Sequence, residues 1–130
     1  MLGPSPYALS VPAFRLRAVA EAAGRAPVGG PREAVMAALL GARLAASALG
    51  ARPLPAAQRA TRSDAARAWL GTVALQPVPK AAMLRLLEST AGGDLGAMAT
   101  ALAKVTDVTA PWLDRPARSA LDSLVQALRA

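Results

Sequence analysis

The apolar stretch from Pro31 to Gly50, PREAVMAALLGARLAASALG, limits the possible folds more than any other part of the chain. Its larger side chains recur every three or four residues, as on a helix, and the small residues between them allow other helices to approach closely. Pro31 suits the first helical turn, because its missing N–H would have no partner there, and Gly50 suits a left-handed stop. The stretch therefore predicts a central helix over 31–50 that packs against neighbours on most sides.

This central helix is not expected to cross a membrane. Its apolar positions number fewer than the roughly 20 residues that a membrane span needs, and Arg43 stands near its middle. The first residues, MLGPSPYALSVPAF, lack the basic segment and long apolar run of a secretory signal. We expect a cytoplasmic protein.

The composition favours helices throughout the chain. Ala contributes 34 of the 130 residues and Leu 19, whereas Ile is absent and Val contributes only 9. Because the β-branched and aromatic residues that fill sheets are scarce, we expect an all-α protein. A chain of this length fits one domain and buries about two-thirds of the surface that it exposes when unfolded.

Proline and glycine breaks divide the rest of the chain. RPLP at 52–55 and QPVP at 76–79 each interrupt a helix, and the pair at 92–93 stops another. The early glycine and prolines predict an extended N-terminal arm over 1–10, followed by a bundle domain over 11–130. We expect a compact single-domain bundle of five to seven short helices around the central apolar helix. Further helices are predicted from Ser10 to Gly24, from Lys80 to Ala91, after a cap at Asp94 and after Asp114.

The segment after Pro55 predicts two helices that meet at a bend. In one unbroken helix, Leu70 and Val73 would lie on the same side as three arginines of this segment. The same helix face is not expected to be buried in the core and to carry a row of arginines. In addition, Ser63 followed by Asp64 resembles a helix cap. We therefore expect helices over about 55–61 and 63–75, with Trp69 in the core.

The last helix carries a narrow apolar stripe made of Ala117, Leu121, Leu124 and Leu128. This spacing fits a helix that closes the bundle, although a seven-residue repeat also suits a partner helix or a second copy of the chain. The other side of the helix alternates charges four residues apart, at Asp114, Arg118 and Asp122, which predicts a solvated face.

The sequence lacks the residue types that most enzymes and metal sites use. It contains no cysteine and no histidine, which removes the thiolate nucleophile, the commonest general base and the usual zinc ligands. The eight carboxylates are scattered, and none forms a DxD, ExxE or ExxH arrangement. We expect a non-enzymatic protein with no catalytic residues, no cofactor and no metal.

Positive charge is concentrated in the first half of the chain. The net charge is +7, and residues 1–67 hold nine arginines against three acidic residues. Guanidinium groups chelate phosphates, so a cluster of them is a candidate partner-binding site, although a solvated polar face is the alternative. No aromatic side chain for base stacking lies among them. The candidate residues are Arg52, Arg59, Arg62 and Arg67.

These exclusions favour a protein that acts through its surface. We expect an accessory, adaptor or regulatory module that binds another protein or a second copy of itself. The alternative is a nucleic-acid-binding protein that uses the Arg-rich helical face, and a membrane-surface protein is less favoured than either. Strongly salt-sensitive binding, lost when the four arginines become Gln, would support the nucleic-acid alternative.

Overall fold

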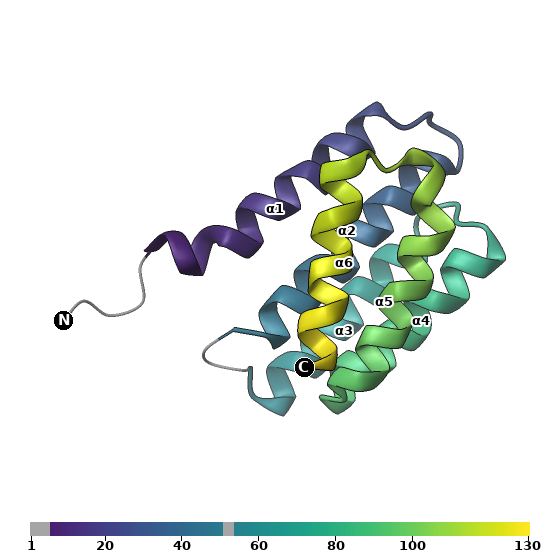
Figure 1. Cartoon of the computed structure of the whole chain (residues 1–130). Helices are drawn as coiled ribbons and strands as arrows, with labels where there is room; N and C mark the ends of the chain where they lie inside the picture. The colour runs from purple at the N-terminus through teal and green to yellow at the C-terminus, as the bar shows by residue number, and fades with distance from the viewer. Residues whose placement is uncertain (1–5, 51–53) are drawn as a thin grey trace.

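The computed structural model describes the backbone of residues 6–50 and 54–130 and the side chains of residues 16–50 and 54–130. The described residues form α-helices with one short 3-10 helix and no strand, so the predicted all-α class is confirmed (Figure 1). None of the helices in these ranges has the length and hydropathy of a membrane-spanning segment. The elements in chain order are α1 (Pro6–Arg25), α2 (Pro31–Ala48), α3 (Ala56–Leu70), α4 (Pro77–Gly92), α5 (Leu95–Thr109), η1 (Ala110–Trp112) and α6 (Arg115–Arg129).

Helix α1 begins at Pro6, earlier than the sequence predicts. Residues 6–10 are therefore helical and not extended, whereas residues 1–5 of the expected arm lie outside the described residues. Pro6 stands at the first helical position, where its fixed φ and missing N–H suit a helix start. The division into an arm and a bundle domain stays a prediction.

Helix α2 starts where the sequence predicts and ends without a left-handed residue. The turn before it places Gly29 and Gly30 at φ of 97° and 130°, which L side chains rarely adopt. The Gly30 N–H donates to the Glu33 carboxylate at 2.6 Å, which satisfies one free donor of the helix start. The expected left-handed stop at Gly50 is wrong, because Leu49 caps the helix in a right-handed conformation and Gly50 has no positive φ.

Helix α2 packs against α1, α4, α5 and α6 (Figure 1). Gly41 lies at its contact with α4, and a Cβ added there would come within 2.7 Å of a Leu86 methyl group. The absence of a side chain therefore sets how closely these two helices approach.

Helix α3 is continuous, so the predicted bend between 61 and 63 is wrong. Ser63, which the sequence suggests as a helix cap, lies inside α3 instead. Ser63 is buried and its Oγ donates to the Leu87 carbonyl of α4 at 2.8 Å, and Thr61 Oγ1 donates to the Ala57 carbonyl one turn back. Ser63, Ala66 and Leu70 form the face of α3 that packs on α4.

Helices α4 and α5, both predicted from the sequence, pack against each other as a hairpin. Gly93 ends α4 in the left-handed conformation, and Asp94 caps α5 by accepting the Ala97 N–H at 3.0 Å. Helix α4 begins at Pro77, three residues before the expected start at Lys80. Leu95, the first residue of α5, is exposed at the corner between the two helices.

Helix α6 closes the bundle against α1 and α5 (Figure 1). Asp114 caps it as predicted, by accepting the Ala117 N–H at 3.0 Å. All four residues of its apolar stripe are buried, so the stripe is not available to a partner helix or a second copy of the chain. Trp69 is less buried than the sequence predicts, because it is half-buried at the edge of the core, and Trp112 is 37% exposed.

Candidate functional site

The structure brings together two of the four candidate arginines. Arg59 and Arg62 both line a pocket beside the end of α2. Arg67 is exposed on α3, about 140° around the helix from Arg62 at 100° per residue. Arg52 lies outside the described residues. The four residues therefore do not form one described basic surface.

The pocket, which we call the Arg59 pocket, has a volume of about 220 Å³. Its wall is mostly apolar and contains no carboxylate, so the two guanidinium groups set its charge. The end of α2, the start of α3 and the corner between α4 and α5 all contribute to it. The lining residues are Leu44, Ser47, Ala48, Leu54, Arg59, Arg62, Thr90, Gly93 and Leu95.

Arg59 is half-buried because it lies on the face of α3 that packs on α4. Its Nη1 donates to the Leu54 carbonyl at 2.9 Å. Its Nε is buried and has no acceptor among the described residues, a state that costs about 1–3 kcal/mol. The guanidinium lies against Gly93, where an added Cβ would come within 3.3 Å of Nη2. Gly93 therefore ends α4 and leaves space for Arg59.

Arg62 lies one turn along α3 and is exposed. Its Nη1 donates to Ser47 Oγ at 3.2 Å, which joins α3 to the end of α2. In the described part of the chain, neither Arg59 nor Arg62 forms an ion pair with a carboxylate. Within the described residues, both positive charges thus lack a carboxylate partner in the wall of a mostly apolar pocket.

A second hollow, the α2–α3 groove, has a volume of about 450 Å³ and adjoins the Arg59 pocket. The sequence did not predict this groove. The apolar side chains of α2, which extend around most of the helix, are the signal that indicates a further apolar surface. Leu44 and Arg62 line both hollows. The groove is lined by Met36, Leu39, Leu40, Arg43 and Leu44 of α2 and by Arg62, Ala65, Ala66 and Trp69 of α3.

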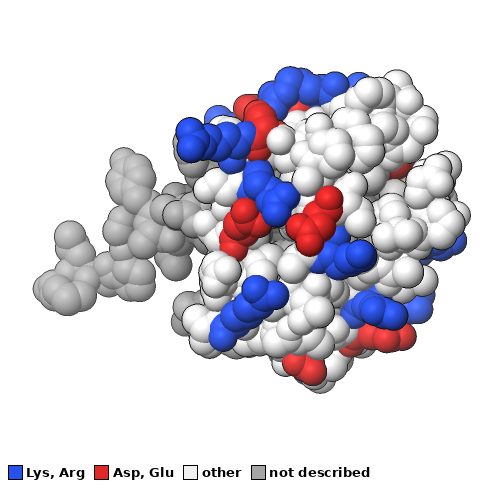
Figure 2. Space-filling model, turned by 45° about the vertical axis from the view of Figure 1, so that its right-hand side comes forward, with Lys and Arg blue, Asp and Glu red and all other residues white. Residues whose placement is uncertain are grey.

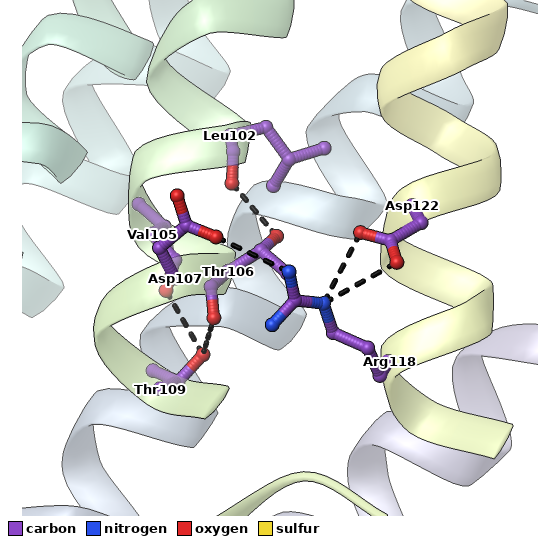
Figure 3. A network of polar contacts seen from close by, with 7 residues as sticks. All are labelled: Leu102, Val105, Thr106, Asp107, Thr109, Arg118 and Asp122. Carbon is purple, nitrogen blue, oxygen red and sulfur yellow. Dashed lines mark hydrogen bonds and ion pairs between the residues drawn. The ribbon is translucent and has the colours of Figure 1, made fainter. Parts of the chain in front are cut away.

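The α5–α6 side carries paired charges instead. Arg118 of α6 donates through Nε to both Asp122 oxygens at 3.3 Å and through Nη2 to Asp107 of α5 at 3.2 Å (Figure 3). Asp114 pairs with Arg25 of α1. Figure 2, turned towards the side of α4 and α5, shows basic and acidic residues interspersed over the surface. This agrees with the solvated face that the sequence predicts for α6.

The remaining polar groups of the described residues are scattered or of mixed charge. No three acidic side chains there lie close enough to hold a metal ion. A wide depression across α4 and α5 is lined by Arg85 and Lys104 together with Glu88, so its charge is mixed.

The pKa of Glu33, at the start of α2, lies below its ordinary value. The chief cause is the hydrogen bond from the Gly30 N–H, and the N–H groups of Glu33 and Gly29 and the charge of Arg32 act in the same direction, against a smaller opposing effect of burial.

No protein-family model, no curated protein and no solved structure matches the chain.

Proposed function

We propose that this chain is a non-enzymatic protein-interaction module that holds an acidic amphipathic helix of another protein in the α2–α3 groove. One observation carries the proposal. The groove combines exposed apolar side chains with Arg43 and Arg62, and its lining contains no carboxylate.

The two walls of the groove have the spacing that a docked helix requires. From α2, positions 36, 39 and 40, and 43 line it, and from α3, positions 62, 65 and 66, and 69. Each set follows the i, i+3/i+4, i+7 pattern of one helix face, so one face of each helix borders the groove. A partner helix with apolar residues at the same spacing fits between them.

The residue types also favour a protein partner. Trp, Met and Arg are enriched at the centres of interfaces, and the groove offers half-buried Trp69 together with Met36, which is 39% exposed. Arg43 and Arg62 have no carboxylate partner among the described residues. Glutamates flanking the apolar stripe of the partner would pair with them and fix its orientation.

Site-specific photo-crosslinking tests the proposal. Ala65 is exposed in the groove, whereas Ala60 is exposed on the same helix about 140° away from it. We expect p-benzoylphenylalanine at position 65 to crosslink one protein in extracts of the source cells, through a helical segment rich in Glu or Asp. The same group at position 60 should not capture that protein.

The captured protein is then purified and titrated. We expect Ala65→Asp to weaken its binding about tenfold or more, because a carboxylate enters an apolar groove that faces acidic groups. Ala60→Asp is the matched control and should leave the dissociation constant within about twofold. Equal effects of both variants would contradict the proposal.

Two other crosslinking results would overturn it. A second copy of this chain captured at position 65 would make the groove a homodimer interface. Capture of nucleic acid, with an affinity that falls by about 0.7 to 0.9 log units per log unit of salt for each phosphate contacted, would establish the nucleic-acid function instead.

A further inference from the structure

We propose that the Arg59 pocket is a separate site that binds a small carboxylate carrying a short apolar chain. The carboxylate pairs with Arg59 and Arg62, and the chain lies on Leu44, Ala48 and Leu95. This inference does not depend on the docked helix. Leu44 and Arg62 line both hollows, but Arg59, Gly93 and Leu95 line the pocket and not the groove.

The charge of the pocket calls for an anion. Two guanidinium groups line it, no carboxylate does, and neither group forms an ion pair among the described residues. Arg59 is half-buried with its Nε covered by the chain, so water solvates its charge only in part. A partly desolvated cation gains more from a nearby anion than an exposed one does, because the local dielectric is lower.

The cation is also held in place before any ligand binds. The Leu54 carbonyl accepts from Arg59 Nη1, and Gly93 packs against the guanidinium in a conformation, φ +71°, that L side chains rarely adopt. Ser47 Oγ likewise holds Arg62. Fixing these long side chains in advance lowers the entropy that a ligand must overcome.

The mostly apolar lining favours a carboxylate over a phosphate, because a monoanion loses less hydration than a dianion on entering the pocket. Each arginine already donates one hydrogen bond to the protein, and the Thr90 hydroxyl donates to the Leu86 carbonyl at 2.8 Å. The guanidinium N–H groups that remain free pair with the two carboxylate oxygens, whereas a phosphate dianion would bring a second negative charge against the apolar wall.

The size of the pocket limits the apolar chain. A volume of about 220 Å³ is below the roughly 300–1,000 Å³ of sites for drug-sized ligands, and it holds about seven groups of the size of a water molecule. A nucleotide is therefore too large. A chain of about six carbons fits this space.

Protein-observed NMR with hexanoate tests the inference. We expect saturable shifts of the Ala48, Gly93 and Leu95 amides, with a dissociation constant of about 1 mM or below. Hexanol and acetate, which keep only the chain or only the carboxylate, should each bind about tenfold more weakly or worse. Hexyl phosphate distinguishes the head group, and tighter binding of it than of hexanoate would overturn the carboxylate assignment.

Three variants locate the site. We expect Arg62→Gln to weaken hexanoate binding about tenfold, as for the loss of one charge-assisted hydrogen bond. Arg67→Gln removes an arginine from the same helix outside the pocket and should change the affinity by less than twofold. Ala48→Phe fills the pocket without changing its charge and should abolish binding, while Ala65→Asp in the groove should not.

Each alternative result contradicts the inference. No saturable shift at 10 mM hexanoate, equal binding of hexanol, or equal losses in Arg62→Gln and Arg67→Gln would each overturn it. The amide spectrum of every variant reports whether the chain remains folded. If Ala48→Phe disturbs the fold, the comparison of Arg62→Gln with Arg67→Gln still decides, because both residues are exposed.

Discussion

Arg118 on α6 and Arg62 on α3 both stand on the surface of a helix, but their surroundings differ. Arg118 lies between Asp107 and Asp122, above an apolar stripe that is buried against α1 and α5 (Figure 3). Arg62 has no carboxylate partner in the described part of the chain and borders two open apolar hollows. We call the α5–α6 side closed, because its apolar stripe is buried and Arg118 is paired, and the α2–α3 side open.

The difference between these two sides of the molecule follows the uneven distribution of charge along the chain. The first 67 residues hold nine arginines and three acidic residues, so most of their positive charges have no counterpart in the same half. Helix α3 increases the difference, because it packs chiefly on α4 and leaves the groove with α2 unfilled. A surface with unpaired cations and exposed apolar groups is one that a partner can complete.

The largest expected effect is on the closed side. Leu121 is fully buried in the α6 stripe, and we expect Leu121→Ala to lower the free energy of unfolding by about 2–5 kcal/mol. Urea denaturation followed by circular dichroism measures this loss. A loss below about 1 kcal/mol would show that α6 is not packed as described.

A smaller effect is expected for the tryptophan of the open side. If Trp69 were completely buried, Trp69→Ala would lower the free energy of unfolding by about 3–5 kcal/mol. Trp69 is instead half-buried at the edge of the core. We expect a loss of about 1–2 kcal/mol, measured by the same denaturation. A loss as large as that of Leu121→Ala would mean that the groove is closed in solution.

The hydrogen bond between α3 and α4 comes next. Ser63 Oγ donates to the Leu87 carbonyl. We expect Ser63→Ala to lower the free energy of unfolding by about 1 kcal/mol, because this carbonyl then loses the hydroxyl that donates to it. Thr61→Ala is the matched control, since the Thr61 hydroxyl is exposed and bonds within its own helix. If α3 bent at this point instead, Ser63→Ala would cost no more than the control.

The smallest expected effect depends on pH. The pKa of Glu33 is lowered in the folded state, chiefly by the Gly30 N–H, so its ionised form stabilises the fold. This stabilisation is fully present above the unfolded pKa, about 4.3, and is lost as the pH falls through the folded value. We expect Glu33→Gln to be less stable than the wild type at pH 7 and to approach it at low pH, in thermal unfolding at each pH. A difference that grows on acidification would contradict this assignment.

Local signals in the sequence predicted the helix starts at Asp94 and Asp114, because a cap depends on a residue and the N–H groups two or three positions later. The burial of the α6 stripe followed from helical periodicity in the same way. These features need no knowledge of which helices are neighbours in space.

Features that depend on distant contacts were predicted less well. Ser63 resembled a cap, yet its hydroxyl bonds to α4, 24 residues away in sequence. Arg59 lies on the packed face of α3 because the Leu54 carbonyl and Gly93 accommodate its guanidinium. The α2–α3 groove exists because α3 packs chiefly on α4. The periodicity of one helix does not indicate which neighbouring helix it packs against.

The central claim is that the open α2–α3 side is where a partner binds. Amide chemical-shift mapping of the labelled chain with the protein captured at Ala65 tests it most directly. We predict the largest shifts at residues 36–44 of α2 and 62–69 of α3, with those of α6 unchanged. Shifts concentrated on α6, around Arg118 and Asp122, would contradict the claim.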